Sequence, residues 1–343
     1  MKKDVFTRLG SLAVGLGVLV GFLFYVGIGN VVNILLSVNP AVIGVMVALQ
    51  LFGFGFYSAA WYHLILAAGY RIRFRVCMGI ALASIFAVYV MPSGVFMEAF
   101  RCILGSKETG MPFGESTASV ILHRILYIVG FLGTTAFALF AVLSSKASDS
   151  VSVLALTSIP IVTIAGLGIL LYFSLNPRKI SPALDRLLKL AQPLIRLLQK
   201  QTVVEGKAIQ FLEEYDVGFR KMATSKRRML LSFLASLGDW CCSVAILWIV
   251  LFSLDTSASV WVVVITISIG RMIQMTPIAI PGMIGVYETA VTTVLVLFSV
   301  PVSIAASAAI LSRLVTVWLE LPITGVAAYH YGFKLLGKGT LRF

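Results

Sequence analysis

The chain has 343 residues, of which 59% are hydrophobic and only 12% are charged, and its mean hydropathy is +1.00. This composition cannot cover a water-exposed surface, which excludes a soluble enzyme, a secreted disulfide scaffold and a disordered chain. The sequence therefore predicts an all-α, polytopic membrane protein. The net charge of +13 is typical of cytoplasmic loops that face anionic lipid, so nucleic acid is not an expected partner.

The apolar runs are long enough to cross the bilayer about six times, since a spanning helix needs about 20 residues. The predicted full spans are 9–29, 41–68, 117–143, 151–175, 229–254 and 303–333. Basic residues precede the first run, as they do in a signal peptide, but this run is longer than a usual signal. We therefore expect an uncleaved first span.

Two further apolar stretches, 77–104 and 259–300, are interrupted in the middle by proline and glycine. Such residues break helices, and broken backbone at membrane depth must be buried in protein or line a water-filled space. The residues expected at the two breaks are Pro92, Gly94, Pro281, Gly282 and Gly285. An alternative is that either stretch is a Pro-kinked ordinary helix or a full crossing.

Loop charge indicates which side each segment faces. Lys and Arg are concentrated in 176–228 and near both termini, whereas the linkers 30–40 and 255–259 contain neither. The positive-inside rule then places both termini and 176–228 in the cytoplasm of a cell-membrane protein. These assignments agree only if each broken stretch enters and leaves on one face. We therefore predict two re-entrant hairpins that approach from opposite faces in an inverted-topology arrangement, which transporters use to build a central site.

The chain accordingly divides into an N-terminal transmembrane half (1–175), a basic segment (176–228) and a C-terminal transmembrane half (229–343). Within the basic segment, leucines from Leu184 to Leu198 recur at helical spacing opposite basic residues. This pattern predicts an interfacial amphipathic helix, or else a helix that packs on other cytoplasmic loops.

Several charged residues lie deep within the predicted spans and hairpins. The candidate substrate-binding residues are Glu98, Arg101, Arg124, Asp239, Arg271, Glu288 and Arg313. Each charge would cost roughly 2.5–3.5 kcal/mol if it faced lipid, so all should face inward. They could form ion pairs that only fix helix register. Because they coincide with both helix breaks, we favour a water-filled translocation site.

The arginines favour an anionic cargo, because a guanidinium binds phosphate through two parallel hydrogen bonds. We expect Arg124 and Arg313 to contact cargo, and Glu98 with Arg101 to position the first hairpin. The four cysteines and three histidines show no metal-ligand spacing, and no phosphate-binding loop for ATP is present. No cofactor is predicted. A transporter is favoured over an enzyme, although Glu98 and Asp239 could imitate a catalytic carboxylate pair.

Four short motifs carry a resemblance that covers almost the whole chain. They are PSGVFMEAFR at 92–101, the pair His123-Arg124, IPGMIGVYETA at 280–290, and Arg313 within AILSRL. In order and spacing they resemble the flippase-like transmembrane family of lysylphosphatidylglycerol synthetases, which includes the membrane part of some archaeal lipid-linked glycosylation proteins. In that family the first motif runs approximately P-G-G-x-G-G-[DE]-x-x-R and the second approximately P-x-x-x-G-G-x-G-x-x-E.

This sequence departs from the family pattern at both breaks. Phe96 and Met97 replace a double glycine, Met283 replaces another glycine, and His123 stands where the family commonly has glutamate. No aminoacyltransferase domain follows within the chain, so the resemblance implies lipid flipping rather than lysine transfer.

The leading hypothesis is thus a flippase or scramblase for anionic or modified phospholipids, with membrane lipids as its partners. Alternatives are translocation of polyprenyl-phosphate-linked sugars, or a scaffold for a glycosyltransferase or lipid-modifying enzyme. A homo-oligomer is possible because Gly53 and Gly55 could allow close helix packing.

Overall fold

The computed structural model describes residues 38–90, 95–144, 205–275 and 280–337, together with scattered positions at 33 and within 161–174. The described residues form helices and no strand. The helices are α3 (Pro40–Ala67), α4 (Phe74–Val90), α5 (Val95–Thr109), α6 (Phe113–Ser144), α9 (Glu205–Thr224), α10 (Lys226–Ser253), α11 (Val260–Met275), α12 (Val286–Leu297), α13 (Val302–Arg313) and α14 (Glu320–Gly337). A 3-10 turn, η2 (Pro281–Met283), precedes α12, and a π-helical turn, η3 (Leu314–Leu319), joins α13 to α14.

Four helical segments are long and apolar enough to cross a membrane: Pro40–Ala67, Phe113–Val142, Lys226–Ser253 and Val302–Tyr331. They correspond to four of the six predicted spans, and the protein is a multi-pass helical membrane protein. The predicted spans 9–29 and 151–175 lie outside, or almost entirely outside, the described residues. So do the termini and the amphipathic leucines between Leu184 and Leu198.

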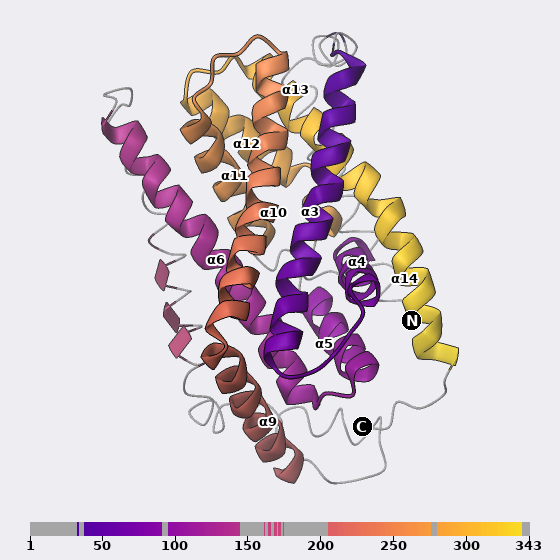
Figure 1. Cartoon of the computed structure of the whole chain (residues 1–343). Helices are drawn as coiled ribbons and strands as arrows, with labels where there is room; N and C mark the ends of the chain where they lie inside the picture. The colour runs from indigo at the N-terminus through magenta and orange to yellow at the C-terminus, as the bar shows by residue number, and fades with distance from the viewer. Residues whose placement is uncertain are drawn as a thin grey trace.

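The long helices α3 and α10 lie side by side through the middle of the molecule (Figure 1). α3 starts sharply because Pro40 occupies its first turn and the Asn39 side chain accepts a hydrogen bond from the Ala41 backbone N–H at 2.9 Å. Glycines let the two helices approach. A Cβ atom at Gly53 would meet the Asp239 carboxylate at 3.2 Å, and one at Gly238 would meet the Phe56 ring at 2.9 Å.

Each interrupted stretch consists of two helices separated at the predicted position. α4 and α5 pack on each other on either side of residues 91–94, which lie outside the described residues. α11 and α12 pair in the same way around η2. In Figure 1, α4 and α5 occupy the lower half of the molecule, and α11 and α12 occupy the upper half. The end of α4 contacts η2, where Tyr89 lies beside Gly282, so α4 reaches the second break.

The backbone of the second break is a tight turn. Gly282, Met283 and Gly285 have φ values of 61°, 52° and 85°. This left-handed region suits glycine but is unfavourable for a long side chain, so Met283 holds a strained conformation. Strained backbone of this kind clusters at functional sites, where surrounding contacts must enforce it.

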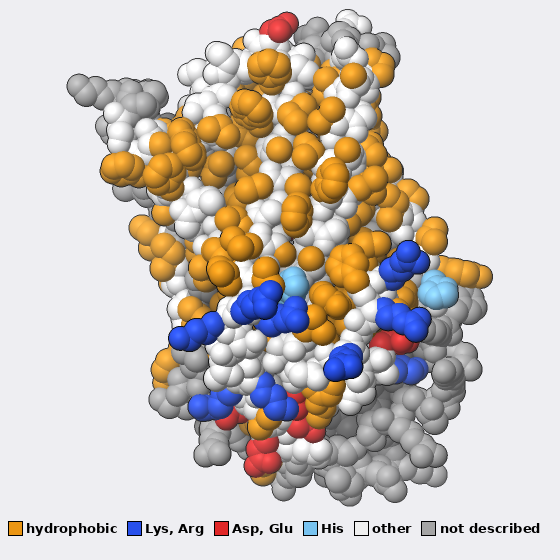
Figure 2. Space-filling view, viewed as in Figure 1, with side chains coloured by type: hydrophobic (Ala, Val, Ile, Leu, Met, Phe, Trp, Pro, Cys, Tyr) orange, Lys and Arg blue, Asp and Glu red, His pale blue; other side chains and the backbone are white. Residues whose placement is uncertain are grey.

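Helix α9 packs closely on the start of α6. The two helices approach at Gly114 and Gly218, and Lys221 forms a 3.2 Å salt bridge with Glu115. The view in Figure 2 shows Lys and Arg side chains gathered around this lower end, whereas hydrophobic side chains dominate the surface above. Exposed basic residues at this end include Arg71, Arg73, Arg75, Arg220, Lys226 and Arg227.

Candidate functional site

A cavity of about 210 Å³ lies where the helix breaks meet. It is lined by residues from every helix named above except α9, and it has room for on the order of seven water molecules, since each takes about 30 Å³ in the liquid. Gly53 and Asp239, which line it, each lie thirteen residues into a helix of 28 residues, counted from Pro40 and Lys226. The cavity is therefore near the mid-height of the two central spans, about 20 Å from their starts.

Most of the charged residues singled out in the sequence line this cavity. They are Glu98, Arg101, Arg124, Asp239, Arg271 and Arg313. Glu288 lies behind them, in contact with Arg313. Among the helix-break residues, Gly282 lines the cavity and Gly285 precedes α12, while Pro281 begins η2. Pro92 and Gly94 lie outside the described residues.

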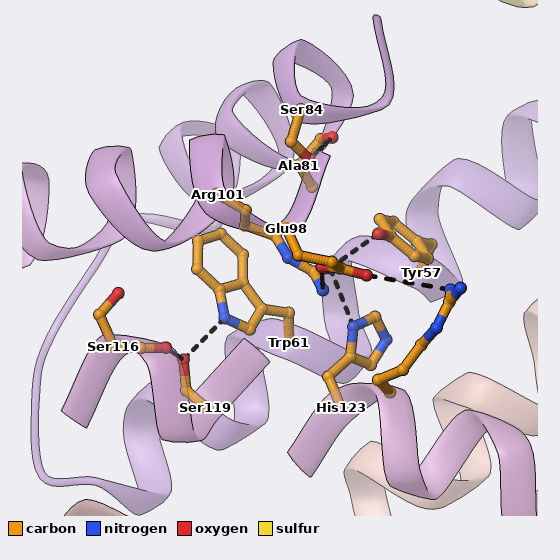
Figure 3. Close-up of polar contacts among 10 residues, drawn as sticks. Tyr57, Trp61, Ala81, Ser84, Glu98, Arg101, Ser116, Ser119 and His123 are labelled. Atoms are coloured by element: carbon orange, nitrogen blue, oxygen red, sulfur yellow. Dashed lines mark hydrogen bonds and ion pairs between the residues drawn. The ribbon is translucent and has the colours of Figure 1, made fainter. Parts of the chain in front are cut away.

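Arg101 is the centre of one polar cluster, which Figure 3 shows beside Tyr57, Glu98 and His123. Its guanidinium donates to Glu98 at 2.5 Å, to the Tyr57 hydroxyl at 2.7 Å and to His123 Nδ1 at 2.9 Å. It also lies against the rings of Tyr57 and Trp61. Arg101 is 1% exposed, so these contacts replace the water that the buried charge has lost.

Arg124 is the more accessible arginine of this region. Its side chain is 36% exposed, and its guanidinium is 3.9 Å from a Glu98 oxygen, at the edge of salt-bridge range. A pair of this geometry holds an arginine weakly. Arg124 therefore keeps most of its donors for another partner in the cavity.

Arg313 belongs to a second cluster that holds the turn at η2. Its Nε donates to Glu288 at 2.8 Å, another guanidinium nitrogen donates to the Gly282 carbonyl, and the charge lies 4.7 Å from the centre of the Tyr287 ring. The other Glu288 oxygen accepts from the Gly285 backbone N–H at 2.7 Å. Glu288 thus caps the N-terminus of α12, and that terminus is not available to a cargo phosphate.

Arg271 donates hydrogen bonds only to neutral side chains among the described residues, although the Asp239 and Glu320 carboxylates lie near enough to interact with its charge. It donates to Ser243 at 2.7 Å and to Gln274 at 3.2 Å. Asp239 also lines the cavity, and within the described ranges its carboxylate has neither a hydrogen-bond donor nor a salt-bridge partner. Gly53 leaves the space that this carboxylate occupies. Both groups can therefore contact a polar guest.

The sequence interpretation left Glu320 and several tyrosines out of the site. Glu320 accepts hydrogen bonds from Tyr89 at 2.7 Å and from Gln50 at 2.9 Å, and all three residues line the cavity. Tyr89 also packs against Gly282, so it joins the two helix breaks. The depth of Glu320 in the last predicted span could have indicated that it belongs to the site. Tyr89 lies in a mostly apolar helix, where no sequence pattern distinguishes it from packing residues.

Residues that bind metals or form disulfides do not gather in the described part of the chain. No group of three or more His, Cys, Asp or Glu side chains there could hold a metal ion. The adjacent cysteines diverge, as expected for neighbours on a helix, since Cys241 is exposed and Cys242 is buried.

Comparison with known proteins places this arrangement in a family. The family described as the lysylphosphatidylglycerol synthase TM region matches residues 11–323. The chain belongs to this family. It is 24% identical over 322 residues to a "UPF0104 membrane protein" of Methanothermobacter thermautotrophicus, covering 91% of this chain and 90% of the relative. It is 25% identical over 317 residues to a UPF0104 membrane protein of Methanocaldococcus jannaschii, covering 87% and 89%.

Proposed function

We propose that this member of the family moves phosphate-bearing lipids across the bilayer, with the headgroup passing through the cavity and the acyl chains remaining in lipid. The observation that carries the proposal is the set of arginines around a cavity at mid-height of the spans. Charged groups inside a membrane are costly and therefore mark substrate pathways. Carboxylates balance these arginines in number, so the preference for an anionic guest rests on the guanidinium donors of Arg124, which only a marginal ion pair engages.

The two interrupted stretches supply the path in this proposal. Each is a re-entrant hairpin, one from the cytoplasmic face and one from the outer face, with their tips meeting at Tyr89 and Gly282. The packing of α4 on α5 and of α11 on α12 supports hairpins over continuous kinked helices. The basic lower end of Figure 2 is the cytoplasmic end by the positive-inside rule. Both termini are then also cytoplasmic.

We assign the arginines different roles on the basis of their contacts. Arg124 and Arg271 bind cargo, because the described residues give the first only a marginal ion pair and the second only neutral hydrogen-bond partners. Arg313 positions the second hairpin, because its buried guanidinium binds Glu288 and the Gly282 carbonyl. The guanidinium of arginine can bind a phosphodiester through two parallel hydrogen bonds, whereas the ammonium of lysine cannot. Lysine therefore cannot fully replace arginine at position 124.

The experiment is lipid translocation in reconstituted proteoliposomes, read from dithionite quenching of acyl-labelled phospholipid. Arg124→Ala should reduce translocation at least about tenfold, the equivalent of losing 1.4 kcal/mol of cargo binding, while the protein remains folded. Arg124→Lys should recover only part of the rate. Arg220→Ala is the matched control, because Arg220 is 71% exposed on α9 and pairs only with Asp216. An Arg124→Ala protein as active as the control would refute the assignment.

A second cargo, a polyprenyl-phosphate-linked sugar, is favoured by a different observation. Tyrosines from four helices line the cavity, namely Tyr57, Tyr89, Tyr127 and Tyr287. Tyrosine presents an apolar ring and a hydroxyl together, and both suit a sugar. A labelled polyprenyl phosphate sugar in the same vesicles tests this cargo directly. If the labelled polyprenyl phosphate sugar is transported faster than phospholipid, the lipid-linked sugar is the preferred cargo.

A further inference from the structure

Around His123, hydrogen-bond donors outnumber the acceptors that the described residues provide. An arginine is always a donor, so the 2.9 Å contact between Arg101 and His123 Nδ1 requires that Nδ1 accepts. The ring is then neutral and carries its proton on Nε2. His123 is 2% exposed, it lines the cavity, and Nε2 is buried without a hydrogen-bond partner in the described part of the chain. A buried donor left without an acceptor is costly, so Nε2 is a candidate to donate a hydrogen bond to a guest in the cavity.

Neighbouring groups add to the same excess of donors. Tyr57 uses its oxygen to accept from Arg101, which leaves the hydroxyl proton for another acceptor. The Nε of Arg101 is also buried and unpartnered within the described residues. Among the described residues, Glu98 is the carboxylate to which this group bonds, and it pairs with both Arg101 and Arg124. With His123 neutral, two arginines and one glutamate give this group a formal charge of +1.

We propose that Tyr57, Arg101, His123 and Arg124 form an oxyanion subsite that selects lipid headgroups with a net negative charge, and that His123 sets this selectivity. The inference rests on the proposed translocation and specifies its cargo. A phosphodiester without an amine supplies the missing acceptors and neutralises the group. A zwitterionic headgroup supplies the same acceptors but places an ammonium beside a cluster that is already positive.

The identity of residue 123 sets both the number of free donors and the formal charge of the group, because a neutral imidazole adds a donor without adding a charge. A glutamate there would accept from Arg101, remove the free donor and bring the formal charge of the group to zero. The cluster would then satisfy itself and would no longer need an anionic guest. Glutamine would preserve the arrangement, since its oxygen can accept from Arg101 while its nitrogen donates to the cargo. His123→Glu and His123→Gln therefore form a matched pair.

The test compares two acyl-labelled lipids, phosphatidylglycerol and phosphatidylethanolamine, in proteoliposomes of the same composition. The native protein and His123→Gln should move phosphatidylglycerol about tenfold faster, as expected for a difference of 1.4 kcal/mol in binding. His123→Glu should bring the ratio of the two rates close to one. His123→Asp serves where the glutamate variant is not recovered from membranes, because it brings the same charge on a shorter side chain, and it should lower the ratio in the same direction. An unchanged ratio in the glutamate or aspartate variant would overturn the inference.

Further outcomes separate this inference from the proposed function. If the native protein moves neither lipid, the translocation of phospholipids is refuted. If it moves both equally, translocation stands and the oxyanion selectivity falls. A thermal-shift arm with glycerol phosphate identifies the source of the anion. Protection of the native protein but not of His123→Glu, together with flipping, supports a lipid headgroup. Protection without any flipping assigns the subsite to a soluble phosphate compound and overturns the lipid assignment.

Discussion

The contacts of Arg313 predict a large and specific stability cost at the second helix break. Arg313 and Glu288 are 4% and 5% exposed, and together they hold the Gly282 carbonyl and the Gly285 N–H. Replacing one member of a buried pair leaves the other charge uncompensated, which typically costs about 3–5 kcal/mol. Arg313→Met should therefore lower the free energy of unfolding by about that amount. It also removes the contact with the Tyr287 ring.

The double variant shows whether Arg313 and Glu288 act together as a clamp that holds the turn at η2, or contribute independently to stability. In Arg313→Met/Glu288→Gln no charge is stranded, and the glutamine oxygen can still accept from the backbone, so much of the stability should return. Unfolding by SDS in mixed micelles measures the free energy of unfolding of the native protein, the two single variants and the double variant, which together form a double-mutant cycle. Arg220→Met is the control, because an exposed helical pair of this kind contributes about 0.3–0.5 kcal/mol. A single variant within 1 kcal/mol of the native protein, or a double variant that costs the sum of the two singles, would refute the clamp.

The remaining predictions concern topology and packing. A cysteine at Lys107, in a background without the native cysteines, should be labelled only from the cytoplasmic side, and labelling from outside would contradict the first hairpin. Gly114→Ala should destabilise the protein by about 1–3 kcal/mol, because the new Cβ would lie 2.5 Å from the Phe211 carbonyl oxygen. Gly133→Ala is its control in chemical unfolding, since that Cβ would meet nothing within 4 Å. Gly94→Leu should block translocation without loss of folded protein, and undiminished flipping would exclude a path past this residue.

Hydropathy predicts the described spans because their composition differs so strongly from that of the loops. The predicted 41–68 and 229–254 correspond to the observed helices Pro40–Ala67 and Lys226–Ser253. The prediction of the second starts three residues late because Lys226, Arg227 and Arg228 are too polar to belong to an apolar run. They are nevertheless helical, since a first turn can extend beyond the hydrocarbon and keep its charges in water.

Partner choice inside the membrane could not be predicted from the sequence in the same way. Residue depth gathers the charged residues into one layer, and most of them line one cavity. Depth does not reveal that Arg313 binds Glu288, 25 residues away, or that Tyr89 and Gln50 bind Glu320. Those pairings depend on helix rotation, which is fixed by packing between apolar faces. The sequence therefore predicted charged residues that line one cavity and left the roles of individual arginines open.

In the translocation site that we propose, the two clusters have different roles. Around Arg313, the Glu288 carboxylate and the Gly282 carbonyl accept from the guanidinium, so contacts within the protein hold the strained turn at η2. Around Arg101, two buried nitrogen atoms have no partner among the described residues, so in the proposed site a guest completes that cluster. If the protein satisfied the donors of both clusters, no donor would remain to bind cargo. If it satisfied the donors of neither cluster, both helix breaks would lack support. Under the proposed function, this asymmetry would allow the second break to remain fixed while cargo engages the cluster around Arg101.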